Sequence, residues 1–275
     1  MKNKIKDIIL QNAELLMKAN QIDKRNGGQT LEINNLCNIV ELVFDNQNLY
    51  GLKLKEINLD NNFVIEKRLA SVGSIGIIEE NNNISNIFYL IMMSIFNKNS
   101  VYINFETSKN LGTFKILVEL LKKVVQEKIE ITQFETNEFA NKVSLLDKLF
   151  IVGEKSFFNE VMIDCSVPCC FVPFGKINVV NFSNNFNEQI KKIESCNFYT
   201  HEDVNNIKEA VDLISCSSTN YLTVLFTDNA KEAEYFLNFS KSDFSFVNTL
   251  PELNNLINLK TADFLRETTL CYCKK

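Results

Sequence analysis

The sequence predicts an α/β protein with a doubly wound, Rossmann-like parallel sheet, followed by a second and smaller α/β unit. Segments with the composition of strands alternate with segments of helical periodicity through most of the 275 residues. In addition, residues 73–105 contain a strand, a helix and a strand in close succession, which predicts a βαβ unit with parallel strands. A plain βαβ unit without any binding function is the alternative interpretation of that stretch.

This central stretch is expected to form a strand, a polar turn, a helix and a strand, over 73–78, 79–83, 84–96 and 101–105. The helix is apolar on nearly all sides, as expected for a helix that packs between a sheet and another layer. The first strand contains Gly73 and Gly76. These glycines either let a cofactor approach the backbone or permit close packing of a helix on the strand.

The segments before and after the central unit continue the alternation. Before it, the pattern predicts two helices and a strand, over 5–19, 31–44 and 63–69. The polar stretch 46–60 is expected to be a loop. After it, helices are expected over 111–125, 137–142 and 157–163, and strands over 129–134, 149–152, 169–174 and 177–182.

The last third of the chain predicts the smaller α/β unit. Its helices are expected over 186–193, 204–214 and 230–239, and its strands over 221–227 and 244–248. Residues 194–202 are polar and predict irregular structure, while 253–259 are ambiguous. Alternation over 268–273 predicts a terminal strand.

Composition excludes several classes of function. The net charge is −5 and no long Lys/Arg block occurs, so the basic footprint of a nucleic-acid-binding protein is missing. No segment approaches the roughly 20 continuous apolar residues that cross a bilayer. Charges interrupt the apolar positions of residues 1–10, unlike in a signal peptide. We therefore expect a soluble cytoplasmic protein that binds neither nucleic acid nor membranes.

Cysteine and histidine usage argues against a metal centre. The eight cysteines form no CxxC pair, and zinc sites usually need such spacings. The expected state is reduced, mostly buried thiols, with no metal. With one histidine in the chain, a Ser-His-Asp hydrolase could be built only around His201.

Several segments match, in order, the motifs of one enzyme family. They are KANQID, KRLASVGSIGIIEE, NSVYINFETSKN, VPCCFVPFGKINVV, IKEAVDLI, TVLFTDNAKEAEYFL, SFVNT and ETTLCYCKK. Together they resemble the glutamate-5-semialdehyde dehydrogenase (γ-glutamyl phosphate reductase) family, a branch of the aldehyde dehydrogenase superfamily. The resemblance implies an aldehyde-dehydrogenase-like fold, NADP as cofactor, and a homo-oligomer held by a terminal strand. It divides the chain into a nucleotide-binding-type domain with a bridging strand, a truncated catalytic-type unit and an oligomerisation strand, at 1–190, 191–262 and 263–275.

The resemblance also assigns cofactor-contacting positions, and the chain departs from the family there. The assigned residues are Glu79, Asn104, Glu106 and Gly153. The family's "LRGGS" segment, which holds the ribose and phosphate of the cofactor, loses its cation and its glycine pair to Asn104, Phe105 and Glu106. Loss of a charge-assisted hydrogen bond costs about 1.5–3 kcal/mol. Glu106 would add repulsion towards a 2′-phosphate.

The expected nucleophile lies in SCNFYT, which resembles the family's "VCNAxET". This places Cys196 as the attacking thiolate and Asn197 as an amide donor to the oxyanion. A Cys-Asn pair is also common in an Asn-rich chain, so an incidental Cys196 is the alternative. The residues after His201 lead directly into IKEAVDLI, which indicates that a block of the catalytic domain is missing. The closing loop of the family is replaced by residues 254–264.

Three functional hypotheses follow. The first is a divergent relative with lost or impaired catalysis that acts as a binding or assembly module. The second is an active NADP-dependent reductase of γ-glutamyl phosphate, in proline biosynthesis, with Cys196 as nucleophile. The third is a nucleotide-binding regulator that keeps the cofactor cleft without the thiol chemistry. A homodimer or larger assembly is expected, and a different protein partner is also compatible with the first hypothesis.

Overall fold

The computed structural model describes residues 1–45, 48–58, 63–80, 83–105, 109–136, 138–139, 146–163, 165–173, 177–181, 199–216, 222–242, 244–248 and 261–273. The chain forms two compact units. The first contains Met1–Val152, Ser156–Val172 and Leu259–Lys275, and the second contains Gly153–Lys155 and Pro173–Asn258. The expected helices over 137–142 and 186–193 and the ambiguous 253–259 lie wholly or mostly outside the described residues.

The first unit is built on a five-stranded parallel sheet with the order β5-β4-β3-β6-β7. Its strands are β3 (Ser74–Glu79), β4 (Ser100–Asn104), β5 (Ile129–Thr132), β6 (Lys148–Gly153) and β7 (Cys169–Pro173). From β3 the chain first moves outward to β4 and β5, and then returns to the other side of β3 with β6 and β7. The sheet is therefore doubly wound, and its topological switch point lies between β3 and β6. This confirms the predicted fold class and the parallel 73–105 unit.

Five helices of this unit are α1 (Lys2–Gln11), α2 (Ala13–Arg25), α3 (Ile33–Asp45), α4 (Ile84–Phe96) and α5 (Leu111–Leu121). The helix α4 contacts both β3 and β4, and α3 packs on its outer side. This arrangement explains why α4 is apolar all round: the residues from Asn86 to Phe96 are all buried. The helix α2 packs on α5, and α1 packs on α3 and α5.

The opposite face of the sheet carries a second apolar cluster under α7 (Lys155–Ile163). Its buried members are Ile78, Tyr102, Phe139, Leu149, Ile151 and Val161. A Cβ atom added at Gly76 would lie 2.9 Å from Leu149 Cδ1 and 3.0 Å from Phe139 Cε1. The structure therefore supports close packing as the reason for this glycine.

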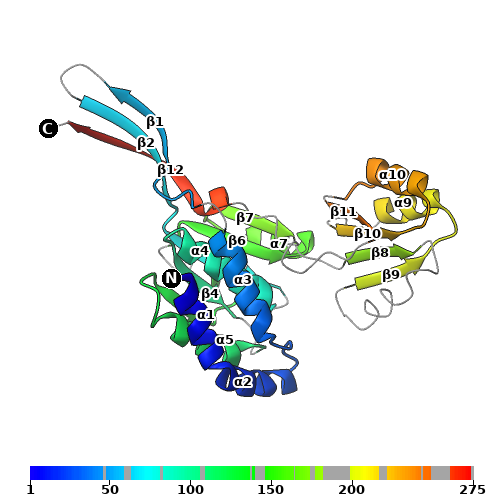
Figure 1. Cartoon of the computed structure of the whole chain (residues 1–275), viewed down its shortest axis with the longest axis horizontal. Coiled ribbons are helices and arrows are strands. Elements are labelled where there is room, and N and C mark those ends of the chain that lie inside the picture. Colours follow the sequence, from blue (N-terminus) through cyan, green and yellow to red (C-terminus); the bar gives the residue numbers. More distant parts are fainter. Residues whose placement is uncertain are drawn as a thin grey trace. The chain divides into compact units, whose positions relative to one another are not determined.

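A three-stranded antiparallel sheet extends from the first unit as an arm (Figure 1). Its strands, in spatial order, are β1 (Lys53–Asn58), β2 (Phe63–Ser71) and β12 (Leu265–Cys273). At the base of the arm, Asn99 donates from Nδ2 to the carbonyl of Phe264 over 2.9 Å and accepts the N–H of Gly73 over 2.9 Å. The ring of Phe264 stacks on Phe150 with centroids 4.7 Å apart, so the base of the arm is held by the core.

The second unit has a four-stranded parallel sheet with the order β11-β10-β8-β9. Its elements are β8 (Ile177–Asn181), β9 (Tyr199–Asp203), α9 (Ile207–Cys216), β10 (Leu222–Phe226), α10 (Ala230–Phe239) and β11 (Phe244–Val247). Ala210, Ile214, Leu225 and Phe236 form its buried core. Because β8 pairs with β9 and β10, residues 177–181 belong to the second unit.

Three local predictions differ from the structure. The expected loop over 46–60 contains β1, and the expected irregular stretch over 194–202 contains all of β9 except its last residue. Both strands are polar and depend on backbone pairing with another strand rather than on apolar alternation. The single helix expected over 5–19 is two helices, because Asn12 bonds back to the carbonyl of Ile8 and ends α1. No helix in the described part of the chain has the length and apolar character needed to cross a membrane.

Candidate functional site

The carboxyl edge of the five-stranded sheet is the candidate site. The strands β3, β4 and β6 end there at Glu79, Asn104 and Gly153. Strand pairing places Ile78 beside Asn104 on β4, and it places Glu79 beside Val152 at the switch point between β3 and β6. In doubly wound sheets ligands bind at this position, because the connections that follow the two strands run to opposite faces of the sheet and leave a crevice between them.

The structure thus brings three of the predicted site residues to one edge of the sheet. Glu79, Asn104 and Gly153 are all buried at strand ends. Glu106, Cys196 and Asn197 lie outside the described residues, and their roles remain predictions.

The carboxylate of Glu79 caps the start of α4. Its Oε2 accepts a hydrogen bond from the backbone N–H of Asn83, and Asn83 Oδ1 in turn accepts the N–H of Asn86 over 3.1 Å. Both side chains are buried, with 4% of their surface exposed. A carboxylate at a helix N-terminus is stabilised by the helix dipole and satisfies N–H groups that lack partners in the helix. The carboxylate of Glu79 therefore occupies the position in which an anionic ligand would bind at the N-terminus of α4.

The amide of Asn104 is engaged by the chain itself. Its Oδ1 accepts from Thr132 Oγ1 over 3.1 Å and from the N–H of Phe134 over 3.0 Å, and its Nδ2 donates to the Phe134 carbonyl over 3.1 Å. The side chain is 2% exposed. Asn104 therefore holds the segment after β5 against the end of β4.

A second carboxylate, missed by sequence reasoning, caps α5. Asp23 at the end of α2 accepts the N–H of Gly112 over 3.2 Å and the N–H of Thr113 over 2.7 Å. It also accepts the hydroxyl of Thr113 over 2.6 Å, and both residues are buried. Residue Asn110, just before α5, has a left-handed backbone with φ of 58° and accepts the N–H of Gln29 on its Oδ1 over 2.9 Å.

The KANQID segment is the signal that could have revealed this cap. Besides Asp23, it contains the buried Asn20. Asn20 donates from Nδ2 to the carbonyl of Gln29 over 2.7 Å and accepts the N–H of Leu31 over 2.8 Å. The polar residues of this motif therefore hold the α2–α3 connection and the start of α5 together. Their role in the structure is to position these elements.

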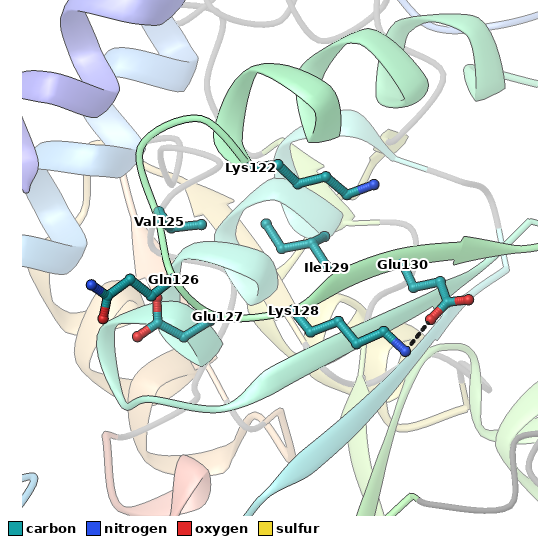
Figure 2. Close-up of a pocket in the computed structure, with 7 residues that line it drawn as sticks. All are labelled: Lys122, Val125, Gln126, Glu127, Lys128, Ile129 and Glu130. Carbon is teal, nitrogen blue, oxygen red and sulfur yellow. Dashed lines mark ion pairs between the residues drawn. The ribbon is translucent and has the colours of Figure 1, made fainter.

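A pocket of about 540 Å³ lies elsewhere, at the turn between α5 and β5. Figure 2 shows its seven lining residues, which are Lys122, Val125, Gln126, Glu127, Lys128, Ile129 and Glu130. This turn precedes β5, so the pocket is at the amino edge of the sheet, opposite the strand ends described above. Its cations pair with carboxylates: Lys122 with Glu119 over 2.7 Å and Lys128 with Glu130 over 2.6 Å. These pairs leave little positive charge for an anionic ligand.

Metal-binding chemistry finds no support in the described part of the chain, where no group of three or more His, Cys, Asp or Glu side chains is placed to hold an ion. The described cysteines are free thiols. Cys37 is buried, Cys165, Cys169 and Cys170 are half-buried, and Cys271 is exposed, so fewer of them are buried than the sequence led us to expect.

The doubly wound sheet, the second parallel unit and the returning strand β12 together make the aldehyde dehydrogenase fold. The chain is similar over 99% of its length to γ-glutamyl phosphate reductase of Thermotoga maritima, covering 92% of that chain with a TM-score of 0.60 and 12% identity. It is similar over its full length to γ-glutamyl phosphate reductase of Saccharomyces cerevisiae, covering 91% of that chain with a TM-score of 0.56 and 11% identity.

A third solved structure extends the likeness beyond the reductases. An NAD-dependent aldehyde dehydrogenase of Sinorhizobium meliloti matches 99% of this chain and 81% of its own, with a TM-score of 0.70 and 10% identity. No protein-family model and no curated protein matches the chain. At these identities the likeness shows the fold, and it confirms the aldehyde-dehydrogenase-like architecture that the sequence motifs implied.

Proposed function

We propose that this chain is a divergent aldehyde-dehydrogenase-fold protein with lost or impaired catalysis, which acts in the cytoplasm as a binding or assembly module. The observation that carries the proposal is the occupation of the carboxyl edge by the chain's own side chains. Glu79 and Asp23 cap α4 and α5, and the amide of Asn104 is held by residues 132–134.

This occupation opposes the binding of a dinucleotide. Its phosphates bind best to free N–H groups at helix N-termini, where the dipole favours negative charge. At α4 the N–H of Asn83 bonds to Glu79 and the N–H of Asn86 bonds to the Asn83 amide, and at α5 two N–H groups bond to Asp23. A phosphate about 6 Å from one carboxylate would be repelled by about 3 kcal/mol at an effective dielectric constant of roughly 20. That energy weakens binding by about a hundredfold. The residues at these two helix starts therefore do not fit NADP.

Calorimetric titration of the purified chain with NADPH and with NADP tests the proposal. We expect no binding in the micromolar range for either form. The Glu79→Gln variant keeps an acceptor for the Asn83 N–H and removes the charge, so it should bind NADPH more tightly than the wild type. The matched control is Glu80→Gln, because Glu80 is the exposed neighbour of Glu79. Micromolar binding by the wild type would contradict the proposal.

An active NADP-dependent reductase of γ-glutamyl phosphate is the second candidate. It is favoured by the match to 92% of the Thermotoga reductase chain and by the Cys196-Asn197 pair. In such an enzyme the phosphate would have to lie at the start of α7, which begins two residues after Gly153. Oxidation of glutamate-5-semialdehyde, followed as NADPH formation and abolished by Cys196→Ala, would establish this function. Turnover that survives the substitution would point to another nucleophile.

The assembly part of the proposal rests on the arm. Its two outer strands, β1 and β12, are edge strands, and unpaired edges invite pairing with another chain. Large apolar side chains on these strands and just before β1 are exposed: Leu52, Leu54, Ile57, Leu270 and Tyr272. We therefore propose a homodimer or larger assembly through the arm. Light scattering at micromolar concentration should show it, and Leu270→Glu should weaken it whereas Lys115→Glu on α5 should not. A monomeric wild type would refute this part.

A further inference from the structure

Two thiols meet at the junction of α7 and β7. The Sγ atoms of Cys165 and Cys169 lie 3.2 Å apart. Each sulfur also contacts the carbonyl of Val167, over 3.5 Å from Cys165 and 3.1 Å from Cys169. A disulfide needs an S–S distance of about 2.05 Å, so the sulfurs must approach by only about 1.2 Å.

The surroundings separate this pair from the other described thiols. Both side chains pack on the apolar cluster under α7. Burial raises the pKa of the Cys170 thiol, which Lys148 lowers and Asp263 raises; successive residues of a strand face opposite sides of the sheet, so its side chain is directed away from that of Cys169. Cys37 lies on α3 and Cys271 lies in the arm. Cys165 and Cys169 are therefore each other's partners.

We propose that Cys165 and Cys169 form a reversible disulfide by exchange with a low-molecular-weight disulfide such as oxidised glutathione. The Cys165 thiolate attacks one sulfur of the small disulfide, the S–S bond breaks, and one small thiolate leaves and takes up the proton that Cys165 lost. The Cys169 thiolate then attacks Cys165 Sγ and expels the second small thiolate, which takes up the proton from Cys169. The chain loses two protons and two electrons, and the small disulfide becomes two thiols.

Cys169 is the resolving member of the pair. Burial, the hydrogen bond with Cys165 and the charges of Cys165 and Cys170 together raise the pKa of Cys169 to about 12. Only a thiolate attacks a disulfide, so ring closure is slow at neutral pH and accelerates by up to about tenfold for each pH unit below that value. The reduced pair is accordingly long-lived unless an oxidant is present.

The crosslink would fix one end of β7. This strand is at the edge of the sheet and bonds only to β6 among the described strands. The carbonyl of Pro168 accepts the N–H of Leu149 over 2.9 Å, just before β7 begins. A Cys165–Cys169 bond would close a short ring at the start of β7 and link the first residue of this strand to Cys165, two residues after the end of α7. The segment leads at Pro173 into the second unit.

Peptide mapping of the full chain tests the inference. The reduced protein is incubated with oxidised glutathione at pH 8, and free thiols are then alkylated. The protein is digested, and the masses of the peptides are measured by mass spectrometry. We expect a Cys165–Cys169 peptide that is lighter by two hydrogens and is restored by dithiothreitol. Cys169→Ser should instead stop at a glutathione adduct on Cys165, whereas Cys170→Ser should form the same crosslink as the wild type.

Three results would overturn the inference. In the first, Cys165 of the wild-type chain is recovered alkylated, so it did not react with glutathione. In the second, Cys165 of the wild-type chain keeps its glutathione adduct. In the third, the crosslink is absent from Cys170→Ser. The wild-type map decides the question even if a variant fails to fold. None of these results depends on whether the chain binds NADP.

Discussion

Replacement of Asp23 by alanine should be among the most damaging single changes in the first unit. The carboxylate is 4% exposed and accepts three hydrogen bonds from Gly112 and Thr113 at the start of α5. The donors lie about 90 residues after Asp23 in the sequence, so this carboxylate links α2 to α5 as well as capping the start of α5. Truncation would leave the buried hydroxyl of Thr113 and two N–H groups without their acceptor.

The expected loss can be estimated from these bonds. Hydrogen bonds to a charged group contribute about 1.5–3 kcal/mol each, and those to one carboxylate are not additive. Water entering the space left by the side chain would recover part of the energy. We therefore expect Asp23→Ala to lower the free energy of unfolding by about 3–4 kcal/mol. For a chain of this size that corresponds to roughly 6–16 °C in Tm.

Urea unfolding followed by far-ultraviolet circular dichroism measures this loss, since the chain contains no tryptophan. The two units can unfold separately, so hydrogen exchange of the α5 amides assigns the change to the first unit. Asp23→Asn keeps one acceptor and should cost about 2 kcal/mol. Asp7→Ala, on the exposed side of α1, should stay within about 0.5 kcal/mol.

The reasoning would be refuted if Asp23→Ala cost less than about 1 kcal/mol. It would also be refuted if exchange accelerated equally in the second unit while the α5 amides stayed protected. Either result would mean that the start of α5 does not depend on the α2 carboxylate.

Three further predictions concern other parts of the first unit. Glu66→Gln removes the charge of a fully buried carboxylate that pairs with Lys53 and Arg68, two half-exposed cations in the arm. We expect the arm to lose about 1–2 kcal/mol of stability, which faster hydrogen exchange of the β2 amides should report. Gly73→Ala should destabilise by more than Gly51→Ala in urea unfolding: both have positive φ, but a Cβ at the first position lies 2.1 Å from a carboxylate oxygen, whereas the second has open space. The hydrogen bond from Lys6 lowers the pKa of Glu41 below its usual 4.5, so this pair stabilises the folded chain above that pH and the contribution disappears as pH falls through the lowered value. Acid unfolding of Glu41→Gln should therefore show a smaller pH dependence below 4.5 than that of the wild type.

The local sequence pattern was sufficient to predict an element where consecutive residues of that element are buried. The helix 84–96 has the predicted bounds because every turn of it is buried, which leaves an apolar signature on all sides. The strands β3 and β4 were predictable because both faces are covered and their residues form continuous apolar runs. In contrast, β1 consists mainly of exposed residues and exists because its backbone pairs with β2. Backbone pairing of this kind cannot be recognised from the residue types of the segment.

The sequence by itself determined the α/β class and the parallel central unit, and it placed Glu79 just after the first strand of that unit and Asn104 near the end of the second, because these depend on residues that are close along the chain. Only the tertiary structure decided what those side chains do: it set the carboxylates of Glu79 and Asp23 on helix starts and closed the Asn104 amide against residues 132–134. It also brought the sulfurs of Cys165 and Cys169 to 3.2 Å. Each of these roles depends on the direction of a side chain and on its neighbour across the fold, and spacing along the chain specifies neither.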